Sequence, residues 1–191
     1  IQNLINLPSD DKVMAYLNVK DLKNEEYLNS HYVIMCTQNG VVKKTCLEAY
    51  SRPRQNGINA IGIREGDMLL EAKLTNGDSD VMIAANSGKA IRFNESKVRS
   101  MGRGASGVRG IMLSSDKEKV IGMICVNNAE SHVLVVSENG YGKRSDIDAY
   151  RVTNRGGKGV KTINITPKTG KLIAIKNVVA VSYTHLTLPT M

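Results

Sequence analysis

Three stretches of the sequence combine arginine or lysine with glycine, a pairing that suits the binding of phosphate. They read SRPRQNGINAI, RSMGRGASGVRGI and RVTNRGGKGVKTI, and their aligned glycines are Gly57, Gly107 and Gly159. Glycine lets backbone amides approach an anion closely, while the basic side chains supply the attracting charge. The chemistry that these stretches predict is therefore the binding of a nucleotide phosphate or of a nucleic-acid backbone.

A nucleotide-binding loop does not fit the third stretch. A P-loop needs GxxxxGK followed by Ser or Thr, placed after a strand and before a helix. Here Gly157-Lys158 is followed by Gly159, and Thr162 comes too late. The three histidines and the acidic turns also form no catalytic set beside a nucleophile. We expect no catalytic residue, no metal site and no cofactor in this chain.

The basic stretches belong to a longer repeat. HYVIMCTQNGVVKKT, DVMIAANSGKAIRF and HVLVVSENGYGKRS each place a turn glycine between an apolar run and a base-bearing run, at Gly40, Gly88 and Gly140. Asn-Gly between two such runs is a strong hairpin signal, so each segment predicts a β-hairpin. After each basic loop we expect a short strand (IGI, IML, INI), a polar turn and an apolar strand (MLLEAKL, VIGMICV, KLIAIKN).

A period near 50 residues with about four short strands per unit predicts an all-β, propeller-like radial array of four-stranded blades. About three and a half units are present, so the chain is a fragment or the array is open. Helical solenoids are disfavoured, because DLKNEEYLNS (21–30), with about one turn, is the best helical candidate. The expected divisions are the closing half of an earlier blade with a linker, then three blades, then a tail: 1–29, 30–78, 79–129, 130–180 and 181–191.

The tail VSYTHLTLPTM matches no unit and resembles the translation of a sequencing adapter. We therefore expect 181–191 to be non-native, with a native disordered tail as the alternative. Neither a secretory signal nor a long apolar run is found. Cys36, Cys46 and Cys125 lack metal-site spacing, and Cys36 and Cys125 lie in apolar runs that predict burial. These features predict a cytoplasmic protein that makes no contact with a membrane.

The net charge of +8 and the pI near 9.4 predict a polyanionic partner. The sequence has no tryptophan and one phenylalanine, so stacking on single strands is poorly supplied and double-stranded DNA is the better prediction. Bases recur at equivalent positions of the units, and equivalent positions of a radial array share one rim. The candidate DNA-binding residues are Lys43, Lys44, Arg52, Arg54, Arg92, Arg99, Arg103, Arg109, Lys143, Arg144, Arg151, Arg155, Lys158 and Lys161.

VMIAANSGKAIRFNESKVRSMGRGASGVRGIML and VSENGYGKRSDIDAYRVTNRGGKGVKTINIT resemble the C-terminal DNA-wrapping domain of the DNA gyrase A-type chain, from a bacterial type II topoisomerase family. The resemblance runs from residue 1 to about residue 180. It implies a β-pinwheel that wraps duplex DNA around a basic rim, largely without base specificity, and so supports ATP-dependent negative supercoiling. TNRGGKG shares five residues with the family's QRRGGKG box, but in a later blade and without the Gln-Arg start.

The resemblance further implies that this chain lacks the catalytic tyrosine and the ATPase site. Its partners would be the rest of the gyrase A protein and the gyrase B protein, with ATP and Mg²⁺ bound elsewhere and the assembly associated with the nucleoid. Two alternatives remain open. One is the equivalent domain of the A-type chain of topoisomerase IV, and the other is a propeller-like protein-interaction module whose charge serves solubility.

Overall fold

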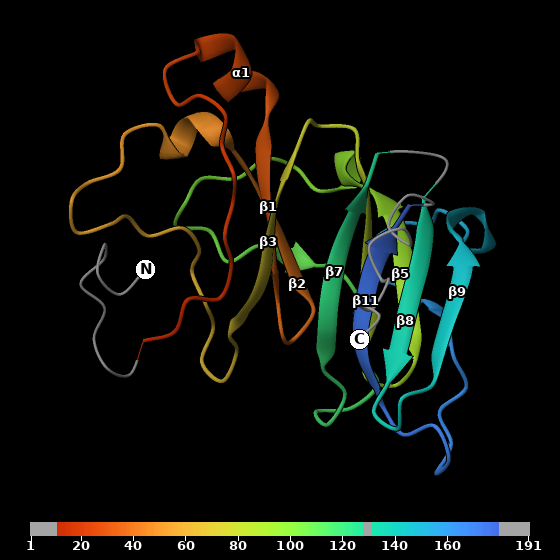
Figure 1. The fold of residues 1–191 in the computed structure, drawn as a ribbon. Coiled ribbons are helices and arrows are strands. Elements are labelled where there is room, and N and C mark those ends of the chain that lie inside the picture. The colour runs from red at the N-terminus through yellow and green to blue at the C-terminus, as the bar shows by residue number, and fades with distance from the viewer. Residues whose placement is uncertain (1–10, 128–130, 180–191) are drawn as a thin grey trace, which may run out of the picture.

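The computed structural model describes residues 11–127 and 131–179, and their regular structure is almost entirely β (Figure 1). The strands form three sheets that follow one another along the chain. In Figure 1 the first sheet lies to the left of β7, and the strands of the third sheet lie to its right. The all-β, propeller-like fold class expected from the repeat is confirmed. The tail 181–191 and the first ten residues lie outside the described residues.

Each sheet is built around one of the three expected hairpins. The turn glycines Gly40, Gly88 and Gly140 have φ of 82°, 77° and 80°, a region in which a side chain would be strained. The strands of each hairpin pair antiparallel without a bulge. The hairpin strands are β1 (Tyr32–Thr37), β2 (Val41–Cys46), β4 (Asp80–Ala85), β5 (Lys89–Asn94), β8 (His132–Ser137) and β9 (Gly142–Asp146).

The third strand of each sheet is the expected apolar strand, and these three strands lie near one another. They are β3 (Leu69–Thr75), β7 (Val120–Val126) and β11 (Leu172–Val178), paired with β1, β4 and β8. The amide of Met123 in β7 donates to Glu71 Oε2 in β3 at 3.0 Å. On β11, Ile175 packs so close to Gly122 that an added Cβ would lie 2.9 Å from Ile175 Cγ2. We call β3, β7 and β11 the inner strands.

The opposite edge of the first two sheets is completed by the following unit. Strand β6 (Val108–Arg109) pairs with β2, and β10 (Val160–Lys161) pairs with β5. These short strands begin directly after Gly107 and Gly159. The strands expected at IGI, IML and INI are not formed. Ile111 is instead buried at the turn of the first hairpin, where its amide donates to Gly40 O. The third sheet has three described strands.

Short helices connect the elements. Helix α1 (Glu25–Ser30) supplies the single helical segment expected within 21–30, and Asn24 caps it by accepting a hydrogen bond from the Tyr27 amide at 3.0 Å. The 3-10 turns that follow the hairpins are η1 (Leu47–Tyr50), η2 (Glu95–Lys97) and η3 (Ile147–Ala149). Residues 11–19, where part of an earlier blade was expected, form no strand.

The hydrophobic core lies between neighbouring sheets. Strand β4 serves two clusters, because successive side chains of a strand point to opposite faces. Val81 and Ile83 join the cluster shared with the first sheet, whereas Met82 and Ala84 join the cluster shared with the third. Cys36 is fully buried, as predicted, and Cys125 packs against the same cluster. A third cluster packs α1 and η1 against the first sheet, so that sheet is stabilised by the neighbouring sheet and by these short helices.

Candidate nucleic-acid interface

The three glycine-containing basic stretches occupy equivalent places in the structure. Each follows a 3-10 turn, and we call them loop 1 (51–62), loop 2 (99–111) and loop 3 (151–163). Loop 2 lies along β2, where the Met101 amide donates to Lys44 O at 2.8 Å. Loop 3 lies along β5, where the Thr153 amide donates to Arg92 O at 2.8 Å. Loops 2 and 3 therefore cover the outer edge of the preceding sheet, opposite the inner strands.

Backbone hydrogen bonds also join the loops to one another. The Gly62 amide in loop 1 donates to Ala105 O in loop 2 at 3.1 Å, and the Gly156 amide in loop 3 donates to Gly110 O in loop 2 at 2.6 Å. In return, Gly157 O accepts a bond from the Met112 amide at 2.8 Å. The three basic loops thus form one continuous edge of the molecule.

Glycine is required where loop 3 meets the second sheet. Gly159 has φ of 73°, and a Cβ added to it would lie 2.5 Å from Ala90 O. Real Cβ atoms do not approach a carbonyl oxygen so closely, so a side chain here would displace the loop. The aligned Gly57 of loop 1 has nearly the same φ, 77°, but open space around its Cα.

Seven of the predicted basic residues present side chains that make no hydrogen bond or ion pair with other residues in 11–127 and 131–179. All are exposed except Arg103, which is half-buried. They come from all three loops. The seven are Arg52, Arg54, Arg99, Arg103, Arg109, Arg151 and Lys158.

Four other predicted residues also lie at the surface. Lys161 is exposed, and its Nζ donates to Asn164 Oδ1 at 3.1 Å. Lys143 is exposed, and its Nζ donates to Thr162 O at 3.3 Å. Arg144 is exposed and follows Lys143 in β9. Arg155 is half-buried and bridges loop 3 to the second unit, since its Nε and Nη1 donate to backbone carbonyls of that unit at 2.9 Å and 3.1 Å.

The remaining three predicted residues join neighbouring units from within. Lys43 is fully buried, and Lys44 is 6% exposed. Arg92 forms an ion pair with Asp80 at 2.8 Å, and its Nη1 donates to Ile147 O at 2.7 Å and Tyr150 O at 3.0 Å. These side chains have protein partners in place of solvent, so we leave them out of the interface proposed below.

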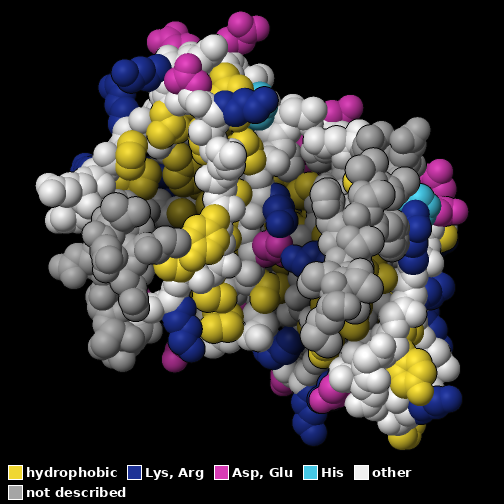
Figure 2. All heavy atoms as spheres, viewed as in Figure 1, with side chains coloured by type: hydrophobic (Ala, Val, Ile, Leu, Met, Phe, Trp, Pro, Cys, Tyr) yellow, Lys and Arg dark blue, Asp and Glu magenta, His cyan; other side chains and the backbone are white. Residues whose placement is uncertain are grey.

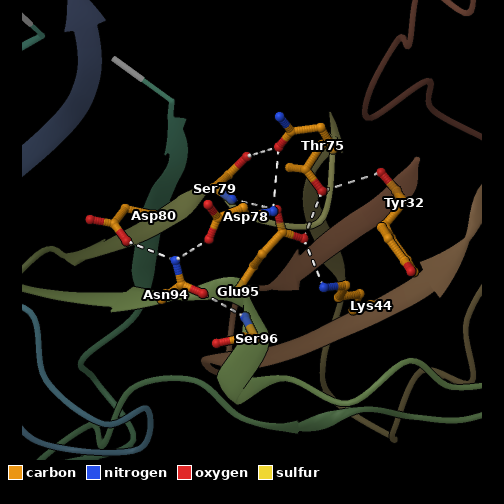
Figure 3. A network of polar contacts seen from close by, with 10 residues as sticks. Tyr32, Lys44, Thr75, Asp78, Ser79, Asp80, Asn94, Glu95 and Ser96 are labelled. Atoms are coloured by element: carbon orange, nitrogen blue, oxygen red, sulfur yellow. Dashed lines mark hydrogen bonds and ion pairs between the residues drawn. The ribbon is translucent and has the colours of Figure 1, made fainter. Parts of the chain in front are cut away.

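Lys44 belongs to a buried polar network between the first and second units (Figure 3). Its Nζ lies 3.0 Å from Glu95 Oε2, and the side chain of Glu95 is fully buried. The carboxylate also accepts bonds from Thr75 Oγ1 at 2.9 Å and from the Ser79 amide at 2.7 Å. Lys44 Nζ lies 4.3 Å from the centre of the Tyr32 ring. A buried carboxylate needs such partners, and together they fix the second unit against the first.

Residues of the loops line several hollows. One hollow separates loop 1 from loop 2, and its walls include Arg54, Gly57, Arg103 and Gly104. Another lies between β5 and loop 3. Its lining includes Arg92, Arg151, Thr153, Lys158 and Gly159. Cationic side chains beside exposed glycine backbone suit oxyanions spaced along an edge, such as successive phosphates.

Figure 2 shows a face on which Lys and Arg side chains are dispersed among acidic and neutral ones, with several along the border over β9. Bases near the loops that were not predicted from the sequence include Arg64 and Lys97, whose carbonyl oxygen accepts a hydrogen bond from Arg155. Arg64 shares a hollow with Arg109 and Val41, but its neighbours Glu65 and Asp67 indicated an acidic turn.

Other kinds of site are not found in the part of the chain that the structure describes. No group of three or more His, Cys, Asp or Glu side chains there could hold a metal ion. Among the same residues, no helix is long and apolar enough to cross a membrane.

Solved structures show the same architecture. The C-terminal domain of DNA topoisomerase IV superposes with a TM-score of 0.81 at 21% identity, covering 92% of this chain and 53% of that one. The DNA gyrase A C-terminal domain superposes with a TM-score of 0.78 at 26% identity, covering 93% of this chain and 57% of that one.

Curated relatives are closer in sequence. The DNA gyrase A proteins of Staphylococcus epidermidis and of Staphylococcus aureus are each 41% identical over 179 residues, which make up 93% of this chain. The chain spans only 20% of the length of these relatives.

The family model described as DNA gyrase C-terminal domain, beta-propeller, matches residues 31–76, 79–127 and 131–178. Each matched segment starts beside the first strand of a hairpin and ends beside an inner strand. Since these three segments make up most of the chain and the fold agrees with them, the chain belongs to the DNA gyrase C-terminal domain family.

Proposed function

We propose that this chain binds duplex DNA along the edge formed by loops 1, 2 and 3 and wraps it there with little base preference. The observation that carries the proposal is the continuity of the three loops, each of which presents basic side chains that have no partner among the described residues. DNA carries one negative charge per roughly 1.7 Å of helix axis, so a long edge of cations can neutralise several phosphates at once. Contacts to phosphates carry no sequence information directly.

The proposed contact residues are the exposed or half-buried members of the predicted set, apart from Arg92, whose guanidinium is paired with Asp80 and donates to two carbonyls of the next unit. The buried Lys43 and Lys44 are also excluded. The set is Arg52, Arg54, Arg99, Arg103, Arg109, Lys143, Arg144, Arg151, Arg155, Lys158 and Lys161.

In the longer protein, the wrapped DNA would be presented to the strand-passage machinery of gyrase and so support negative supercoiling driven by ATP. The partners would be the rest of the gyrase A protein and the gyrase B protein, near the nucleoid. Neither strand passage nor ATP turnover is expected of this chain by itself. The 41% identity to gyrase A proteins favours this role over the equivalent one in topoisomerase IV.

The salt dependence of binding tests the proposal. With about two phosphate contacts for each of three loops, log K for a duplex of about 30 bp should fall against log salt with a slope of about −5. Duplexes of different sequence should give the same slope and similar affinities. A slope near zero, or strong preference for one short sequence, would contradict the proposal and favour a protein-interaction module.

A matched pair of variants separates the loops from net charge. Replacing Arg54, Arg103 and Lys158 by Ala should make the slope of log K against log salt shallower by about 3. Replacing Lys12, Lys73 and Lys176 by Ala removes the same charge from outside the loops and should change the slope little. Equal effects of the two triple variants would show that general charge, not the loop edge, attracts DNA.

A further inference from the structure

Lys43 is a fully buried lysine whose Nζ donates to two backbone carbonyls. It donates to Ala60 O of loop 1 at 2.7 Å and to Arg103 O of loop 2. Burying an ammonium costs free energy unless hydrogen bonds replace water, and an apolar side chain of similar size would fill the space at lower cost. Burial, and after it the nearby Arg103 guanidinium, lower the pKa of Lys43.

The fold itself does not require a cation at this position. Ile91 occupies the equivalent place in β5 and is buried at 2% exposure in the core. Lys143 occupies it in β9, is exposed, and donates to one carbonyl, that of Thr162 in the loop of its own unit. Within the described residues, Lys43 is the member of this series that joins two successive loops.

The two carbonyls that Lys43 holds lie directly beside the hollow between loops 1 and 2. Arg103 is itself in the wall of that hollow, and Ala60 directly follows the wall residues Ile58 and Asn59. Arg54 of loop 1 lines the same hollow. Tyr50 Oη also donates to Ala60 O, at 3.2 Å, so the carbonyl is fixed from two sides.

We infer that Lys43 is a positioning residue for DNA binding, which ties loop 1 to loop 2 and so sets the separation of Arg54 and Arg103 for one stretch of phosphodiester backbone. This inference rests on the proposed function. It assigns Lys43 a role through the two arginines, without contact between its own ammonium and a phosphate. The hollow is then a pre-formed phosphate-binding site rather than a gap between independent loops.

The Lys43→Met variant tests this inference, because methionine keeps much of the side-chain length but cannot donate. We expect the slope of log K against log salt to become shallower by about 1 to 2, as when one or two phosphate contacts are lost. Lys73→Met is the matched control. It removes the same charge from β3, on the opposite edge of the same sheet, and should leave the slope unchanged.

A double-mutant comparison distinguishes positioning from general destabilisation. In a background with Arg54→Ala and Arg103→Ala, Lys43→Met should weaken DNA binding no further, because its targets are already absent. Its effect on the urea midpoint of unfolding should be the same in both backgrounds. A lysine with a purely structural role would weaken binding by the same factor with or without the arginines, and that result would overturn the inference.

Two further outcomes keep the inference separate from the proposed function. If the unmodified chain binds DNA with the expected slope and Lys43→Met binds identically, the inference on Lys43 is wrong and the proposed function stands. If the unmodified chain shows no salt-dependent binding to DNA, both the proposed function and the inference on Lys43 are wrong. Should Lys43→Met fail to fold, Lys43→Gln, which retains a donor of shorter reach, takes its place. Its slope is expected to be shallower than that of the unmodified chain, and an unchanged slope would overturn the inference.

Discussion

The basic side chains of the repeated units serve different ends, depending on where in the unit they stand. The side chains of Lys44 and Arg92 bind partners in the next unit. Lys44 pairs with Glu95, and Arg92 donates to the carbonyl oxygens of Ile147 and Tyr150. The loop bases, such as Arg54 and Lys158, remain exposed. A cation with a buried carboxylate as partner contributes to the structure of the array, and one that faces solvent is available to a polyanion.

Removal of the Lys44 ammonium should be costly because it would leave the fully buried Glu95 carboxylate without its counter-ion. We expect Lys44→Met to lower the free energy of unfolding by about 3 to 5 kcal/mol, measured by urea denaturation. The matched pair is Lys73 with Glu71, whose side chains are 40% and 22% exposed. Lys73→Met should cost about 1 kcal/mol or less.

The double variant Lys44→Met with Glu95→Gln provides the complementary measurement. It removes the unpaired charge, so it should be less destabilised than Lys44→Met alone. If it is instead more destabilised, by the sum of the two single effects, then the ion pair in Figure 3 does not act as a unit.

At the scale of the element, the aligned glycines Gly57 and Gly159 separate backbone strain from packing. Both have positive φ, so Ala at either site should cost about 1 kcal/mol through strain. Only Gly159→Ala also places a methyl against Ala90 O, so it should cost clearly more and should displace loop 3 from β5. Urea unfolding of the two variants, with amide exchange at Thr153 and Thr162, tests this; equal costs would contradict the close approach.

The polar turn before β7 contains a carboxylate that should make stability depend on pH. Burial by itself raises the pKa of Glu118, but hydrogen bonds from Ser87 Oγ and the Ser114 amide, with the charge of Lys89, outweigh burial and lower it below its usual 4.5. A lowered folded-state pKa means stability that is present above the unfolded-state pKa and is lost as pH falls through the folded-state value.

We therefore expect Glu118→Gln to reduce the loss of stability on acidification from about pH 5 to pH 3. Urea midpoints measured at several pH values give the comparison. Identical profiles for Glu118→Gln and the unmodified chain would show that the Ser87 and Ser114 bonds do not favour the ionised form.

Local patterns were enough to predict the hairpins, because Gly40, Gly88 and Gly140 mark turns between apolar runs. They did not reveal β6 and β10, since two-residue strands show no alternation and pair with residues of the preceding unit. Burial of Lys43 and Lys44 was missed for a related reason. A charged residue after a turn is typical of a solvated position, and the partners of these two lysines lie largely in the next unit.

For the whole molecule, strand sharing ties the units into one array. The first sheet is completed by β6 of the second unit, and the second by β10 of the third, so no unit is independent of the next. The same connections place loops 2 and 3 on the outer edge. A substitution that disturbs one unit should therefore change the spacing of the loops and also lower the stability of the array.

Wrapping, as distinct from binding, requires the loops to act together along a curved path. Bending 20–30 bp smoothly by 40–90° costs on the order of 1–6 kcal/mol, which several contacts in each loop must offset. We expect energy transfer between dyes at the two ends of an about 30-bp duplex to rise when the unmodified chain saturates it.

Replacing Lys158 and Arg151 of loop 3 together by Ala should separate DNA binding from DNA bending. Loops 1 and 2 would still bind DNA, so the duplex should still be saturated, although at higher protein concentration. The rise in energy transfer should be smaller, because the DNA would be bent along a shorter part of the loop edge. Lys12→Ala with Lys176→Ala, the charge-matched control, should match the unmodified chain in both respects. Saturation without any rise, for the unmodified chain, would mean that the loop edge binds DNA without bending it.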